Sequence, residues 1–154
     1  MEKWAGCPLF FSEMQSEDHD IIRHVEHIAA PVVEEEGFDF AVGSRMLSES
    51  KVERSRRRRA VSALYNSLIR WMLGSKLKDH QCGFKAFKRE ALLQVMNEVV
   101  ARHWFWDTEL LVRASRKGYA IAEIPVEWKS PVGTKVNLLK DSLSMGGQAV
   151  KLWW

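Results

Sequence analysis

The chain has 154 residues, of which 46% are hydrophobic and 28% charged, and its formal net charge is +3. This length suits one domain with a substantial core, and the small net charge gives no general reason to expect a nucleic-acid partner. No apolar run approaches the roughly 18 residues that a membrane-spanning helix needs. The first residues lack the pattern of a secretory signal, so none is expected. The two cysteines lack metal-binding spacing and are expected to stay reduced, as in the cytoplasm.

The start of the chain predicts one helix followed by one strand. Residues 1–17 show little periodicity and receive no assignment. Apolar residues at helical spacing predict a helix over 21–35, which Pro31 should kink and Gly37 should end. The short apolar run 38–42 then predicts a buried strand.

The middle of the chain predicts a long amphipathic helix. Residues 43–45 are expected to form the turn at the end of the first strand, and 46–53 a polar loop. Apolar residues recur at helical spacing over 54–73, and Gly74 is the expected stop.

The second half of the chain alternates between strands and helices. It predicts strands over 84–88 and 119–126 and helices over 89–100, 107–117 and 136–154. Helices that alternate with strands favour an α/β layer architecture.

Two carboxylates separated by one residue, Asp18 and Asp20, are the candidate metal ligands. On a turn, both side chains can reach one hard cation with their oxygens. Because such a pair arises often by chance, ordinary surface acids are the alternative.

A basic block, defined as Arg54 to Arg59, opens the predicted helix 54–73. Arg45 follows the first predicted strand, where a fixed guanidinium would suit a phosphate, and helix N-termini also favour anions. The alternatives are a solvated face, a membrane-surface patch or a nucleic-acid site. The last is the least favoured, because no aromatic residues are interleaved in the block.

The segment 79–88 joins Asp79, Gln81 and Lys85 to a glycine and two phenylalanines. The alternative to a binding role is a turn in which Gly83 provides backbone freedom and the phenylalanines enter the core.

The segment 104–111 places Asp107 and Glu109 beside three aromatic residues. A carboxylate in such surroundings is partly desolvated and is therefore either paired with a cation or used in chemistry. Side chains two residues apart diverge on a helix, so the two acids should have separate roles. The alternative for Asp107 is a helix N-cap.

Together, the segments 79–88, 104–111 and 118–128 resemble family 2 glycosyltransferases, and above all the enzymes that make dolichyl-phosphate-linked glucose or mannose. The resemblance runs from about Asp18 to Trp154. It implies a GT-A fold, a Rossmann-like α/β domain of three layers, here expected to lack its first βα units. Residues 18–135 would then form the acceptor-side half, followed by an amphipathic helix over 136–154.

The resemblance also implies a reaction and its residues. A hexose would pass with inversion from UDP-glucose or GDP-mannose to dolichyl or another polyprenyl phosphate. Asp107 would act at the acceptor and Glu109 would position the sugar or neighbouring cations, while Asp18 and Asp20 would bind Mg²⁺ or Mn²⁺. The residues implied at phosphates and sugar are Arg45, Arg58 or Arg59, Ser62, Asp79, Gln81, Lys85 and Lys135. A phosphate monoester is already largely anionic near neutral pH, so positioning by cations should matter more than base strength.

Two expectations concern activity and location. Without the strands that bind the nucleotide, this chain is expected to turn over poorly, and an inactive remnant that binds a membrane or a partner is the alternative. Trp153 and Trp154, apolar positions in 136–154 and the basic block predict peripheral attachment to an anionic, cytoplasmic membrane surface. The alternative is that the last helix packs on the fold.

Overall fold

The computed structural model describes residues 30–34, 36–101, 105–129 and 138–153. Within these ranges the helices are α2 (Ala30–Glu34), α3 (Arg56–Leu73), α4 (Arg89–Met96), α5 (Trp106–Arg116) and α6 (Leu138–Trp153). The strands are β1 (Phe40–Ser44), β2 (Lys51–Glu53), β3 (Lys85–Phe87), β4 (Ile121–Pro125) and β5 (Glu127–Lys129). None of the described helices is both long and apolar enough to cross a bilayer.

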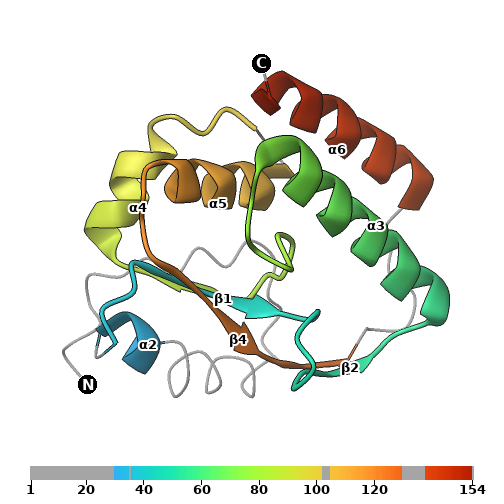
Figure 1. Ribbon diagram of the computed structural model, residues 1–154, viewed down its shortest axis with the longest axis horizontal. Helices are drawn as coiled ribbons and strands as arrows, with labels where there is room; N and C mark the ends of the chain where they lie inside the picture. The colour runs from blue at the N-terminus through green and yellow to red at the C-terminus, as the bar shows by residue number, and fades with distance from the viewer. Residues whose placement is uncertain (1–29, 35, 102–104, 130–137, 154) are drawn as a thin grey trace, which may run out of the picture.

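Strand β1 is the centre of a three-stranded sheet of order β3-β1-β4. It runs antiparallel to β3 and parallel to β4, so that Phe40 lies opposite both Phe87 and Ile121. Strands β2 and β5 form a separate parallel pair, and β2 lies below the first turns of α3 in Figure 1. The predicted strands 38–42, 84–88 and 119–126 are therefore confirmed as strands, with shifted ends.

Helices cover both faces of this sheet, and β1 supplies side chains to both. Ala41 packs in a cluster with Val32 and Val33 of α2. Phe40 and Val42 pack on the opposite side with residues of α4 and α5, including Leu111. Figure 1 shows α2 below the sheet and the other helices above it. This alternation along a central strand produces a mixed α/β fold, as the sequence predicts.

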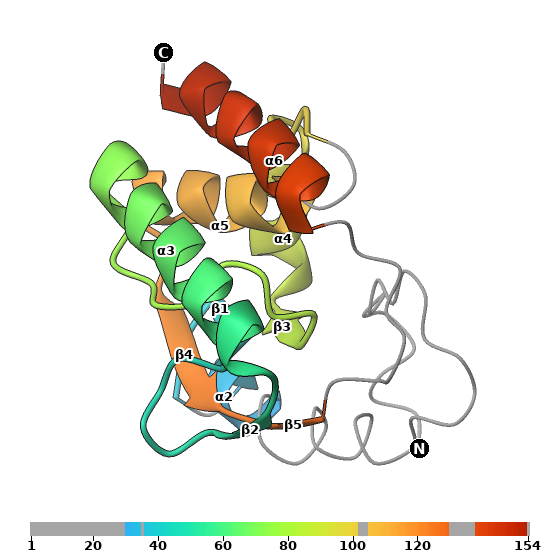
Figure 2. The same cartoon turned by 90° about the vertical axis from the view of Figure 1, so that its right-hand side faces the viewer.

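A third cluster holds the outer helices together. Tyr65 and Ile69 of α3 pack with Val112 of α5 and with Met145 and Ala149 of α6, all of them buried. Figure 2 shows α3 and α6 side by side, with α5 behind them. The described part of α6 thus packs on the fold, the alternative considered for this helix.

The predicted turn at 43–45 is wrong at its first two residues, because β1 continues through Gly43 and Ser44. A Cβ on Gly43 would come within 2.7 Å of Val126 Cγ1 and 3.1 Å of Phe84 Cβ. Glycine therefore serves close packing here rather than a turn. The turn begins at Arg45.

The long helix closely matches its prediction. Ser55 is the N-cap of α3, and its Oγ accepts a hydrogen bond from Arg58 N. Gly74 ends the helix with a φ of 67°, the left-handed conformation that favours glycine. Helix α4 ends earlier than predicted, at Met96. The predicted loop 46–53 contains β2, whose three residues, Val52 between two exposed charged residues, are too few to predict a strand.

Candidate active site

A buried, bidentate ion pair joins the end of β1 to the loop before β3. Arg45 donates from Nε to Asp79 Oδ2 at 2.7 Å and from Nη2 to Asp79 Oδ1 at 2.9 Å. The backbone N–H of Arg45 also donates to Oδ2, at 3.0 Å. Asp79 is fully buried and the Arg45 side chain nearly so. This bidentate geometry fixes the guanidinium in one orientation.

The same contact shifts both groups toward their charged forms. Burial alone would raise the pKa of Asp79, but the hydrogen bonds and charge of Arg45 outweigh it and hold that pKa below its usual range. Burial likewise opposes the charge on Arg45, while Asp79 and the more distant Asp107 raise the pKa of the guanidinium. Arg45 also lies 5.8 Å from the centre of the Trp128 ring, a cation–π distance.

Backbone hydrogen bonds hold the loop around Asp79. Glu123 of β4 accepts from the N–H groups of Lys78 and Asp79, at 2.9 and 3.0 Å. Asp79 in turn accepts from the N–H of Gln81 at 3.1 Å. The loop is therefore attached to the edge of the sheet and to Arg45 at once.

A buried network attaches the same loop to α3. The backbone N–H of His80 donates to Asn66 Oδ1, and His80 Nδ1 lies 2.8 Å from the same oxygen. His80 Nε2 lies 2.8 Å from Ser75 Oγ. Because Asn66 Oδ1 can only accept, Nδ1 carries the proton and Nε2 accepts from the hydroxyl. Burial lowers the pKa of His80 to about 4, so the ring is neutral at neutral pH.

The second charged pair joins β3 to α5. Lys85 Nζ lies 2.8 Å from Asp107 Oδ1 and donates to the carbonyl of Cys82 at 2.6 Å. The Lys85 side chain is 6% exposed and that of Asp107 is 30% exposed, so solvent reaches the carboxylate of Asp107 but hardly reaches the ammonium group of Lys85. The N-cap alternative for Asp107 is wrong: Phe105 occupies the N-cap position and no side chain caps α5.

Glu109 diverges from Asp107, as its spacing predicts. It is buried, and its Oε2 accepts from the backbone N–H groups of Val100 and Ala101, at 3.2 and 2.6 Å. Its Oε1 accepts from Arg113 Nε at 2.7 Å. These contacts of Glu109 fix the segment before α5, whereas Asp107 pairs with Lys85.

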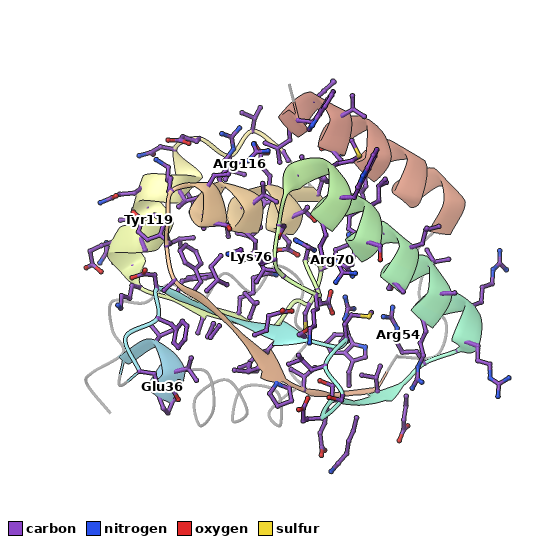
Figure 3. The ribbon with its side chains drawn as sticks, viewed as in Figure 1. Glu36, Arg54, Arg70, Lys76, Arg116 and Tyr119 are labelled. Carbon is purple, nitrogen blue, oxygen red and sulfur yellow. The ribbon has the colours of Figure 1, made fainter. Side chains whose placement is uncertain are left out.

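Arg54 is the residue of this site that the sequence analysis did not select. Its Nη1 donates to Ser62 Oγ at 3.2 Å, while its buried Nε has no hydrogen-bond partner among the described residues. Burial and the neighbouring charges of Arg45 and Arg58 lower the pKa of Arg54. Figure 3 shows Arg54 between the first turns of α3 and the strands below. A half-buried guanidinium whose buried Nε–H has no partner among the described residues, and which lies near other cations, is suited to an anion. The one feature of the sequence that pointed to Arg54 was its position in the basic block.

The other residues predicted to bind phosphate or sugar, Arg58, Arg59 and Gln81, differ in burial and in their contacts. Arg59 lies at the surface, with Nη2 donating to the carbonyl of Val52, and Arg58 is half-buried. Gln81 Nε2 lies 3.4 Å from Met145 Sδ of α6.

The predicted metal ligands, Asp18 and Asp20, and the predicted phosphate ligand Lys135 lie outside the described residues. The part of the chain that the structure describes contains no group of three or more histidine, cysteine or acidic side chains placed to hold a metal ion.

Known proteins match most of this chain. It is 47% identical over 133 residues to glycosyltransferase AglD of Haloferax volcanii, a match that covers 86% of the chain and 21% of the relative. It is 35% identical over 114 residues to the dolichyl-phosphate beta-glucosyltransferase of Saccharomyces cerevisiae, covering 71% and 34% respectively. The human dolichyl-phosphate beta-glucosyltransferase is 34% identical over 108 residues, covering 69% and 33%.

The resemblance to dolichyl-phosphate glycosyltransferases is confirmed. The chain nevertheless spans only about a fifth to a third of the length of these relatives. No family model matches the chain, and no solved structure matches it.

Proposed function

We propose that this chain forms the acceptor side of a glycosyltransferase that moves a hexose from a nucleotide sugar to dolichyl phosphate or another polyprenyl phosphate. The relatives named dolichyl-phosphate beta-glucosyltransferase favour glucose as the sugar and therefore UDP-glucose as the donor, and mannose from GDP-mannose is the alternative. The observation that carries the proposal is the convergence of Arg45–Asp79 and Lys85–Asp107, which come from the segments that resemble the family. The charge of Asp107 contributes to raising the pKa of Arg45, so the two pairs lie within electrostatic range of each other.

The proposed reaction is a single displacement at the anomeric carbon of the hexose. A phosphate oxygen of the acceptor forms the new bond to C1, and the bond from C1 to the nucleoside diphosphate breaks on the opposite face. The electron pair leaves with the diphosphate, and the anomeric configuration inverts. The acceptor phosphate is already largely anionic near neutral pH, so its approach and the departing charge need cations more than a strong base.

The described residues fit this requirement. Arg54, with Ser62 beside it, is the proposed contact for the acceptor phosphate, and Arg58 or Arg59 extends this positive region along α3. Asp107, held by Lys85 and partly open to solvent, would orient the acceptor next to the sugar. Gln81 would line the sugar side, on the loop that the buried Asp79 holds in place, and Glu109 would hold the segment before α5.

The metal, the fold family and the location remain part of the proposal. Mg²⁺ or Mn²⁺ on Asp18 and Asp20 would neutralise the diphosphate when bound, and Lys135 would lie beside phosphate. The mixed sheet covered by helices on both faces supports a partial GT-A domain. A lipid acceptor requires the site to lie at a membrane surface, which we place on the cytoplasmic side.

The test is a segment exchange in the Haloferax relative. Its matched region is replaced by the corresponding part of this chain, and transfer of labelled sugar to polyprenyl phosphate is measured with each donor. Transfer above background that falls with Asp107→Asn supports the proposal. A chimera with native circular dichroism but no transfer from any tested donor contradicts it and favours a binding module instead.

A further inference from the structure

Three polar side chains on one face of α3 reach toward the candidate site. Tyr65 and Asn66 follow Ser62 by three and four residues, so all three lie on the same side of the helix. Ser62 Oγ accepts from Arg54 at 3.2 Å, and Asn66 Oδ1 accepts from the backbone N–H of His80 at 2.9 Å. Tyr65, between them, reaches the first turn of α5. One helix face therefore contacts the proposed phosphate contact, the loop before β3 and the start of α5.

The contact of Tyr65 with α5 is a buried hydrogen bond. Its hydroxyl lies 2.8 Å from Thr108 Oγ1, and either group can donate. Thr108 is fully buried and Tyr65 is 7% exposed, so a hydroxyl that lost its partner here would have no water to replace it. The Tyr65 ring also belongs to the buried cluster that contains Phe105, the N-cap residue of α5. Tyr65 thus holds α5 on both sides of Asp107 in the sequence.

The start of α5 depends on contacts of this kind with other elements. The N-cap residue makes no side-chain hydrogen bond to the helix, so the first turn lacks a local support. Asp107 lies in that turn, 2.8 Å from Nζ of Lys85 on β3. Burial raises the pKa of the Tyr65 hydroxyl well above its usual range, and the charge of Asp107 adds to the rise, so the hydroxyl lies within electrostatic range of the carboxylate. A shift of this turn would turn Asp107 away from Lys85.

We propose that Tyr65 is a positioning residue, whose hydrogen bond to Thr108 sets the direction of the Asp107 carboxylate. The inference rests on the proposed function, in which Asp107 orients the acceptor and the phosphate is bound beside Ser62. Because Ser62 and Tyr65 are one turn apart on α3, a single helix then sets the distance between the bound phosphate and the acid. A misplacement of about 1 Å can lower a rate by about a hundredfold, so one hydrogen bond can have a measurable effect.

The test uses the chimera with the Haloferax relative. Tyr65→Phe removes the hydroxyl and keeps the ring, and it should lower kcat about tenfold with little change in the KM for polyprenyl phosphate. Thr108→Val should lower kcat to the same extent, whereas Thr108→Ser, which keeps a hydroxyl, should preserve it. The matched control is Tyr119→Phe, which removes a hydroxyl that donates to Gln94 of α4 at 2.6 Å and should leave kcat unchanged.

A double-mutant cycle separates positioning from a general loss of folded protein. In the Asp107→Asn background, Tyr65→Phe should cause no further loss of kcat, because the group that it positions has already been changed. Equal losses in the two backgrounds overturn the inference. Full activity of Tyr65→Phe in an active chimera overturns it as well and leaves the proposed function intact.

The purified chain offers a second measurement that does not depend on sugar transfer. In urea denaturation, Asp107→Asn changes the unfolding equilibrium constant by some factor, which should be on the order of threefold smaller in the Tyr65→Phe background. The reason is that the ion pair with Lys85 requires an ordered first turn of α5. Independent effects of the two substitutions overturn the inference. Coupled effects, together with an unsubstituted chimera that transfers no sugar, would support the positioning of Asp107 and refute the proposed function.

Discussion

Asp107, in the first turn of α5, is held 2.8 Å from Nζ of the buried Lys85 on the sheet. The pair joins the two segments in which the sequence places carboxylates beside aromatic residues. Asp107 remains partly exposed to solvent, so a ligand can reach its carboxylate, while the ion pair with Lys85 fixes the orientation of that carboxylate.

We expect Asp107→Asn to lower the rate of transfer by about a hundredfold in the active chimera, with little change in KM. The amide keeps the shape of the side chain but removes the charge that is paired with Lys85. Steady-state kinetics with varied acceptor separate the two parameters. Full activity of the variant would reduce Asp107 to a structural partner of Lys85.

The matched control is Glu109→Gln, which changes the other acid of α5. Because Glu109 is buried and binds two backbone N–H groups and Arg113, this variant should lose about 1–3 kcal/mol of stability instead. Urea denaturation should show this loss in Glu109→Gln, while sugar transfer by the folded chimera should fall far less in Glu109→Gln than in Asp107→Asn.

Breaking the Arg45–Asp79 pair should destabilise the fold strongly. Asp79→Asn leaves a buried guanidinium without its counter-charge, a change that typically costs about 3–5 kcal/mol. The folded state depresses the pKa of Asp79, so its contribution is present above the unfolded pKa of about 3.9 and is lost as pH falls below it.

The pH dependence of this contribution can be measured by urea denaturation of the original chain and of Asp79→Asn. A range from about pH 3 to about pH 7 includes the pKa of about 3.9 of an unperturbed aspartate. The difference in unfolding free energy should be constant near neutral pH and shrink in acid. If the difference in unfolding free energy did not change with pH, the stabilising role given to the ionised Asp79 would be wrong. Glu90→Gln, at an exposed acid on α4, should leave the curve unchanged.

His80 should weaken the fold in mild acid. Its pKa is about 4 when folded and about 6.5 when unfolded, so the unfolded chain takes up the proton first as pH falls. Stability should therefore decrease from about pH 6.5 to about pH 4, by at most about 3 kcal/mol, and then level off. A proton NMR titration of the imidazole signals measures the folded value directly. A titration midpoint near 6.5 for His80 would contradict this account.

Gly43→Ala should destabilise the centre of the sheet by about 1–3 kcal/mol. The added Cβ would meet Val126 Cγ1 at 2.7 Å and Cys82 Sγ at 3.0 Å, on both sides of a paired strand. Gly83→Ala is the matched control, because a Cβ there meets nothing within 4 Å, and its effect should stay within about 0.5 kcal/mol. Thermal unfolding of the two variants measures the contrast, and equal shifts would contradict the packing argument.

Local signals predicted the long elements of this fold. The apolar spacing in 54–73 predicted the extent of α3, and Gly74 predicted its end. Both signals arise from residues within or next to this one helix. Strand β2 was missed because its partner β5 lies far away in sequence, and its own three residues alternate only between charged and valine side chains.

The acidic residues of the candidate site could be selected from the sequence more readily than the basic residues. Asp107 and Asp79 stood out by their unusual neighbours, and both are paired with buried cations. Arg54 could not be distinguished from the other arginines of the basic block, because its difference is burial beside Ser62, which depends on how α3 meets the strands. Glu109 likewise shows its structural contacts only once the segment before α5 is in place.

The contacts of Arg45 also bear on how quickly and selectively an anion can be captured. A free arginine side chain carries about 2 kcal/mol of rotamer entropy, which a ligand must remove when it orders the guanidinium. Here Asp79 and Trp128 already hold that group from two directions. The ordering is therefore completed when the chain folds, and under the proposed function a phosphate that reached Arg45 would meet a guanidinium whose direction is fixed in advance.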